Sequence, residues 1–262
     1  MAVGAVSDRR IGPGDGTAEA EWLSWPGLAA LPELTLETLA PDGARVFVVA
    51  PHPDDEVLAA GGLLSLLARR GRACHVVSVT EGEASHRGSS AWPRERLRLE
   101  RPLETRRALQ RLGLQNAMAT TRRLALPDGG LSTQRRRLAK EIKALLRCDD
   151  VVVTTWRRDG HPDHEATGEA VAEAAAAVGA RLVEVPVWAW HWAEPGDPRL
   201  PWHRAHRLVL DDKAMRDKWH AVQSFTSQLH ADPSTGREPV LPSTSVMRCK
   251  RSFEVMFLGA DK

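Results

Sequence analysis

The chain has 262 residues, of which 42% are hydrophobic and 27% charged, and its formal net charge at pH 7 is +2. This is the composition of a globular protein, and it excludes a wholly disordered or fibrous chain. The basic residues are spread along amphipathic helical patterns and the total charge is near neutral, which argues against a nucleic-acid partner.

The sequence also argues against a membrane partner or an exported protein. No stretch reaches the ~18 consecutive apolar residues that a membrane span needs, and the N-terminus lacks the apolar centre of a signal peptide. The three cysteines are far apart and form no CxxC pair, a pattern typical of a reducing compartment. We therefore expect a cytoplasmic protein, and the sequence carries no signal for an oligomeric state.

Along the chain, a segment rich in small residues precedes a regular alternation of strands and helices. Residues 1–20 are predicted to form a loose arm and residues 21–262 a single domain. Strands are predicted at 44–50, 73–80, 121–126, 150–155 and 181–190, and helices at 56–71, 94–114, 131–147 and 164–179. A further helix, a Pro- and Ser-rich loop and an edge strand are expected after them. This alternation predicts an α/β fold with a mainly parallel, Rossmann-like three-layer sheet and helices on both faces.

Two clusters of metal-type side chains follow two of the predicted strands. PHPDDE at 51–56 follows the first strand, and WRRDGHPDHE at 156–165 follows the strand at 150–155. Because ligands bind outside the carboxyl ends of the strands in open α/β sheets, we expect the clusters to face one another. A catalytic Zn²⁺ takes three N/O ligands and leaves one position open, and the clusters can supply His52, Asp55 and His164. Fe²⁺ accepts the same donors, so the metal identity stays open.

Neighbouring side chains are free for other roles. Asp54 cannot share the ion with the next carboxylate without strain, so we expect it to be a general base toward water. His161 lies three residues before His164 at a predicted helix N-terminus, and Asp163 is available to hold its ring in one tautomer. Taken singly, each residue has an ordinary alternative, since a lone His is usually structural and an Asp after a strand often caps a helix.

These residues resemble the signatures of the PIG-L, or LmbE-like, family of metal-dependent de-N-acetylases. PHPDDE matches the (A/P)HPDDE signature of that family, and HPDH at 161–164 matches its second signature. The resemblance implies Zn²⁺ binding by His52, Asp55 and His164, and a general base at Asp54. It implies that His161 stabilises the oxyanion or protonates the leaving amine.

Weaker correspondences concern the substrate. RPLETRRALQRLG at 101–113 resembles a helix whose first Arg contacts substrate, which implies Arg101, and LPDGGL at 126–131 resembles a turn whose Asp binds a sugar hydroxyl, which implies Asp128. The Ser-Gln pair of the tail implies Gln228 near the cleft. Some family members use a Tyr two residues before HPDH, whereas this chain has Asp159 there and no Tyr anywhere.

The implied reaction is hydrolysis of an N-acetyl amide on an amino sugar. The substrate would be a small molecule, with an N-acetylglucosaminyl group on a biosynthetic intermediate or on a glycosylated natural product. Two alternatives remain from the residues. The same His/Asp/His set could be the facial triad of a non-haem Fe(II) oxygenase, and the chain could be a non-catalytic sugar-binding module.

Nine Trp against no Tyr is an unusual composition, and the stretch VWAWHWAEPGDPRLPW at 187–202 is rich in Trp. If the strand predicted at 181–190 continues, alternation places residues 188, 190 and 192 on one side. One interpretation makes Trp190 and Trp192 a wall of the substrate cleft. The other makes these rings part of the core, where aromatic side chains bury large areas.

Overall fold

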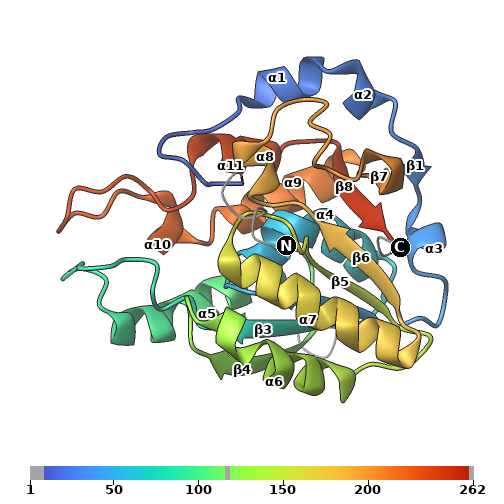
Figure 1. Cartoon of the computed structure of the whole chain (residues 1–262), viewed down its shortest axis with the longest axis horizontal. Helices are drawn as coiled ribbons and strands as arrows, with labels where there is room; N and C mark the ends of the chain where they lie inside the picture. Colours follow the sequence, from blue (N-terminus) through green and yellow to red (C-terminus); the bar gives the residue numbers. More distant parts are fainter. Residues whose placement is uncertain (1–8, 116–118, 260–262) are drawn as a thin grey trace, which may run out of the picture.

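The computed structural model describes residues 9–115 and 119–259 of the chain. These residues form one eight-stranded sheet in the order β1-β7-β8-β6-β5-β2-β3-β4 (Figure 1). All neighbouring strands are parallel except β8, which is antiparallel to both β6 and β7. The strands are β1 Glu33–Leu34, β2 Val46–Ala50, β3 Cys74–Thr80, β4 Ala119–Leu126, β5 Val151–Thr155, β6 Arg181–Val185, β7 Ala205–Val209 and β8 Phe253–Leu258.

Helices cover both faces of this sheet (Figure 1). The long ones are α4 Asp55–Arg69, α5 Arg94–Arg111, α6 Leu131–Lys143, α7 Pro162–Val178 and α9 Asp212–Val222. The short ones are α1 Glu19–Ser24, α2 Pro26–Ala29, α3 Leu36–Leu39, α8 Ala189–Trp192, α10 Thr226–Leu229 and α11 Ser243–Arg248. Helices α4, α5 and α9 pack on one face, and α6 and α7 pack on the other.

The strand β2 shows why the sequence produces three layers. All five of its residues are buried, as expected for a central strand of a parallel sheet covered on both faces. Val46 and Val48 belong to the core under α4, α5 and α9, whereas Phe47 and Val49 belong to the core under α6 and α7. The predicted three-layer α/β fold with a mainly parallel sheet is confirmed.

Two predictions about the later elements are wrong. The strand expected at 181–190 ends at Val185, because Pro186 follows and residues 189–192 form the helix α8; a proline has no N–H for the sheet ladder. The tail strand, β8, lies between β6 and β7 and not at an edge of the sheet. Its neighbour β7 and the two-residue edge strand β1 were not predicted, since neither has a long apolar run.

The N-terminal arm is described only in part, because residues 1–8 lie outside the described residues. From Arg9 onward the chain contacts the rest of the protein: Arg9 pairs with Glu165 (3.2 Å), and Thr17 donates to the Ala193 carbonyl oxygen (2.6 Å). The three cysteines are free. Within residues 9–115 and 119–259, we find no helix that combines the length and apolarity needed to cross a membrane.

Candidate metal centre

The first candidate segment is the turn between β2 and α4, which holds His52, Asp54 and Asp55. Asp54 has a φ of 136°, a conformation that costs a non-glycine residue about 1–3 kcal/mol and persists only where its surroundings impose it. Arg101 of α5 donates to the Pro53 carbonyl oxygen (2.6 Å) and to Asp54 Oδ2 (3.0 Å). The buried guanidinium of Arg101 therefore holds the strained turn in place.

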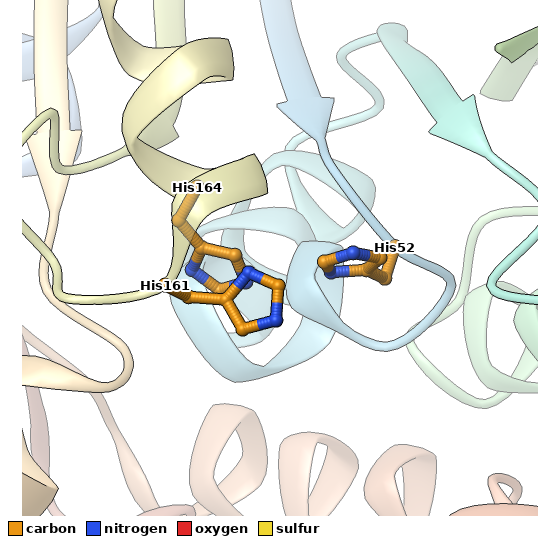
Figure 2. A group of neighbouring side chains, drawn as sticks. All are labelled: His52, His161 and His164. Atoms are coloured by element: carbon orange, nitrogen blue, oxygen red, sulfur yellow. The ribbon is translucent and has the colours of Figure 1, made fainter. Parts of the chain in front are cut away.

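The second segment is the start of α7, which follows β5. Because β5 pairs with β2 in parallel, α7 begins at the sheet edge where the first turn lies. His161 is the N-cap of α7, and His164 lies in its first turn. Figure 2 shows these two rings beside that of His52, with ring centroids 5.0 Å and 5.4 Å from it. The two clusters meet, as the strand order of the sequence predicts.

Asp55 lies between two of these histidines. Its Oδ2 is 3.2 Å from His52 Nδ1 and 3.2 Å from His164 Nε2. Burial opposes the charge on both Asp55 and His164, but their attraction outweighs it: the pKa of Asp55 is held below its usual range, and Asp55 with Asp159 raises the pKa of His164 to about 9. The three side chains form a compact group of opposite charges.

His164 is oriented by a second carboxylate. Its Nδ1 lies 2.8 Å from Asp159 Oδ2, and Asp159 in turn accepts the N–H groups of residues 187–189. His164 Nε2 is buried, and the nearest polar atom recorded for it among the described residues is Asp55 Oδ2 at 3.2 Å, an ion-pair contact without hydrogen-bond geometry. A metal-ligating His is usually held by a carboxylate on one nitrogen, and here the other nitrogen faces a second carboxylate, Asp55, that could bind the same ion. The residues present therefore fit a divalent cation beside Asp55.

Two more carboxylates surround His52. Its Nε2 lies 3.2 Å from Asp128 Oδ1 and 3.3 Å from Asp163 Oδ2. His52 therefore belongs to two groups whose ligand atoms could hold a metal, one with His161 and His164 and the other with Asp128 and Asp163. The metal set predicted from the sequence, His52, Asp55 and His164, shares two members with the first group.

Asp163 contacts His161 in a way that the sequence did not predict. We expected its carboxylate to hold the His161 ring, but that carboxylate accepts the N–H groups of Gly129 (2.7 Å) and Leu131 (3.0 Å). The backbone N–H of Asp163 instead donates to His161 Nδ1 (3.2 Å). Burial, with the positive charges of His164 and His52, lowers the pKa of His161 to about 3. A neutral His161 therefore carries its proton on Nε2.

Asp54 is buried beside Arg101. Burial raises the pKa of Asp54 to about 8; the Asp55 charge adds to the increase, and Arg101 opposes it. Arg101 also donates to the Gly82 carbonyl oxygen (2.8 Å), and a Cβ at Gly82 would lie 2.0 Å from Arg101 Nη1. Arg101 lines the cavity, but its hydrogen bonds are with the turn and with Gly82, so the structure gives it a role in positioning Asp54 that the sequence did not indicate.

A cavity of about 320 Å³ opens onto this group, within the range of small-molecule sites. Seven of the ten site residues predicted from the sequence line it, and Asp163, Trp190 and Trp192 do not. Two further lining residues are Gln228 and Trp188. The lining residues among the predicted set are His52, Asp54, Asp55, Arg101, Asp128, His161 and His164.

Residues 47–175 match the family model PIG-L, described as GlcNAc-PI de-N-acetylase. The chain carries a PIG-L domain. This confirms the resemblance inferred from the two signatures. All three histidines of Figure 2 lie within the matched residues.

Known proteins also resemble the chain. A probable N-acetyl-α-D-glucosaminyl L-malate deacetylase 2 from Bacillus anthracis is 32% identical over 51% of this chain, which spans 60% of that relative's length. A 1D-myo-inositol 2-acetamido-2-deoxy-α-D-glucopyranoside deacetylase from Rhodococcus jostii (strain RHA1) is 28% identical over 72% of this chain and 83% of the relative. The structure of the A40926 pseudoaglycone deacetylase Dbv21 shares the fold, with a TM-score of 0.61, 23% identity, and coverage of 84% of this chain and 100% of that chain.

The tryptophans after the PIG-L domain are not arranged as a strand would place them. Trp190 is 6% exposed and meets Trp22 edge-on, with ring centroids 4.7 Å apart. Trp192 donates from Nε1 to the Asp159 carbonyl oxygen (2.7 Å). Trp188, which the sequence placed on the same side as Trp190 and Trp192 but which was not predicted as a site residue, lines the cavity and stacks toward His161. The expectation that Trp190 and Trp192 form the cleft wall is therefore corrected, because a helix does not bring residues 188, 190 and 192 to one side.

Trp190→Ala is expected to lower the free energy of unfolding by about 3–5 kcal/mol, because it removes a large ring from a packed aromatic cluster. Trp188→Ala is expected to cost less, since Trp188 is only half-buried. Chemical denaturation of both variants, followed by far-ultraviolet circular dichroism, makes the comparison. Equal losses in the two variants would contradict the assignment of Trp190 to the core.

Proposed function

We propose that the protein is a zinc-dependent hydrolase that removes the acetyl group from an N-acetylglucosaminyl unit of a small molecule. The PIG-L domain supports this reaction class, and both curated relatives are named as deacetylases of N-acetylated glucosamine derivatives. The observation that carries the proposal is the position of Asp54: a buried carboxylate outside the metal-ligand set, lining the same cavity as His52, Asp55 and His164.

The proposed ligands of the metal are His52, Asp55 and His164, and Fe²⁺ could replace zinc on the same donors. When bound, the metal would act as a Lewis acid and make water a stronger acid. Asp54 takes a proton from the water that attacks the amide carbonyl, because it is the carboxylate that Arg101 holds beside the three proposed ligands. A metal ion bound close to Asp54 would favour the ionised form of its carboxyl group and so oppose the effect of burial on its pKa.

His161 has a separate part in the proposed reaction. Because its Nδ1 accepts the Asp163 N–H, its Nε2–H is the donor that can face the substrate. A preorganised donor of this kind stabilises the oxygen on which negative charge develops, and removing one costs about 2.7–4 kcal/mol in other enzymes. The resemblance to the family also allowed a protonated His161, whereas its lowered pKa favours the neutral ring.

The test is incubation of the metal-loaded protein with a panel of N-acetylglucosaminyl compounds. We expect acetate release by nuclear magnetic resonance and an equal amount of free amine by mass spectrometry. Loading the apoprotein separately with Zn²⁺ and Fe²⁺ compares the two metals. If no member of the panel loses its acetyl group with either metal, the proposed function is wrong; oxygen consumption with an oxidised product would support the oxygenase alternative.

Arg101→Met is expected to move the acid limb of the pH profile of deacetylation to higher pH by about 1–3 units. Arg101 lowers the pKa of Asp54. Loss of its guanidinium therefore raises that pKa, and a higher pH is then needed to ionise Asp54. Arg101→Lys keeps the charge and should restore much of the profile. Arg98→Met, an exposed change on the same helix, is the control, and an unshifted limb in Arg101→Met would rule out this role.

A further inference from the structure

A second cavity, of about 470 Å³, lies beside the first. Three residues line both cavities, Trp188, Val240 and Leu241, so the two spaces share a wall. The second cavity is otherwise lined by His191 of α8, by the loop at 238–243, and by four residues of the N-terminal arm, Ile11, Gly12, Gly14 and Asp15. A ligand that fills the first cavity and extends past Trp188 enters the second.

The arm that forms this wall is held in place by the body of the protein. The Gly12 carbonyl oxygen lies 3.0 Å from His191 Nε2, and Asp15 Oδ1 accepts the Ser243 N–H (3.0 Å). Gly16 has a φ of +66°, and a Cβ there would lie 2.5 Å from His191. The turn therefore approaches His191 as closely as a glycine permits, and these contacts hold the arm as one wall of the second cavity.

The charges of the second cavity are unfavourable to anions. Its lining includes the carboxylates of Asp15 and Glu238 and, among the described residues, no Lys or Arg. In the described part of the chain, the first cavity has one lining Arg or Lys, Arg101, and its guanidinium is already bonded to Asp54 and to two carbonyl oxygens. Apolar surface comes from Ile11, Val240 and Trp188. An uncharged or cationic group with apolar area complements this lining.

We propose that the second cavity is an acceptor subsite, which binds the group attached to the N-acetylglucosaminyl unit, and that this group has apolar area and carries no negative charge. The inference rests on the proposed function, because the reacting amide must lie in the first cavity beside the histidines. All residues that line the second cavity lie outside residues 47–175. The PIG-L domain thus supplies the reaction, and the arm and the 238–243 loop select the substrate.

The test compares glycosides of N-acetylglucosamine that differ in the attached group. The set consists of the methyl glycoside and three phenyl glycosides, with a methyl, a trimethylammonium or a carboxylate group at the para position. We expect kcat/KM to be higher for the neutral and cationic phenyl glycosides than for the methyl glycoside. The para-carboxylate should lower kcat/KM by on the order of fivefold relative to the neutral para-methyl phenyl glycoside. This is the effect of one like charge several ångströms away in partly screened solvent.

Glu238→Arg tests the charge of the subsite. Glu238 is exposed, so the variant should fold, and the preference for the trimethylammonium over the carboxylate glycoside should disappear or reverse. Asp42→Arg makes the same change of charge at a side chain that is 98% exposed and precedes β2, at the opposite sheet edge; its preference should stay that of the wild type. An unchanged preference in Glu238→Arg overturns the proposed selectivity.

Calorimetric binding of the same glycosides to the metal-free protein separates the two proposals. Tighter binding of the neutral and cationic phenyl glycosides than of the methyl glycoside supports the subsite even if no acetate is released, in which case only the proposed reaction fails. Release of acetate from the methyl glycoside, together with equal affinities for all four compounds, overturns the subsite and leaves the proposed function standing.

Discussion

Asp54→Asn is expected to keep the bound metal and to lower turnover by about 10²–10⁴-fold, the usual contribution of a general base. The amide has the same size, and its oxygen can still accept the bond from Arg101 Nη2, which joins Asp54 Oδ2 at 3.0 Å in the wild type. It cannot take a proton from water. The measurement is acetate release at saturating metal, with metal content determined by atomic emission on the same samples.

The same variant has an expected effect on stability that a damaged structure would not produce. In the metal-free protein, burial raises the pKa of Asp54 from 3.8 to about 8, so between these values the native state binds more protons than the unfolded state. The free energy of unfolding therefore falls as the pH rises through this range. The free energy of unfolding of Asp54→Asn should fall less steeply with pH, because this variant has no carboxyl group to titrate at position 54.

The control for both measurements is Asp42→Asn, which makes the same chemical change at an exposed side chain far from the cavity. It should match the wild type in turnover and in the pH dependence of unfolding. Turnover of Asp54→Asn close to that of the wild type would mean that another group, or the metal alone, deprotonates the attacking water.

The meeting of the two clusters could be predicted because it depends on few variables. A run such as VFVVA is buried on both faces only as a central strand, and parallel neighbours present their carboxyl ends at one sheet edge. Once β2 and β5 were predicted as parallel strands, His52 and His164 had to lie at the same edge. The details of their contacts did not follow from this reasoning, because they depend on Asp128 in the turn after β4 and on Asp159 in the loop after β5.

The stretch around Trp188 shows where periodicity misleads. Alternate tryptophans at 188, 190 and 192 fit a strand, and no local signal except Pro186 argues against it. The structure forms a helix there, because Asp159 gathers three successive N–H groups of residues 187–189 at one carboxylate. A contact between residues some thirty positions apart cannot be found by examining either segment alone.

Asp159 is itself a residue that the sequence marked only as a departure from the family, since some members have Tyr at this position. In the structure it is fully buried and lies 2.8 Å from His164 Nδ1. Its burial would be costly without partners, and His164 and the N–H groups of residues 187–189 supply them. The side chain thus couples the Trp188 wall of the cavity to the orientation of a proposed ligand.

His164→Ala is expected to abolish stoichiometric metal binding, because it removes one of three proposed protein ligands and leaves Asp55 with a single imidazole neighbour. Asp159→Asn is expected to weaken binding by about 10–100-fold, the usual effect of losing the partner of a ligating His. Atomic emission after dialysis against a metal buffer measures both. His191→Ala is the control, since His191 contacts the arm and does not line the first cavity.

The same assay distinguishes the three ligand groups that share His52. If the ligands are His52, Asp55 and His164, then Asp55→Ala should lose metal as completely as His164→Ala, because Asp55 Oδ2 lies 3.2 Å from both imidazoles. His161→Ala and Asp128→Asn should then retain it. If Asp55→Ala keeps the metal and His161→Ala loses it, the ligands are instead the three histidines of Figure 2. If Asp128→Asn loses the metal and His164→Ala keeps it, the ligands are His52, Asp128 and Asp163. Either result would leave Asp55 as a partner that orients His52, and the general base would have to be reassigned from the new position of the ion.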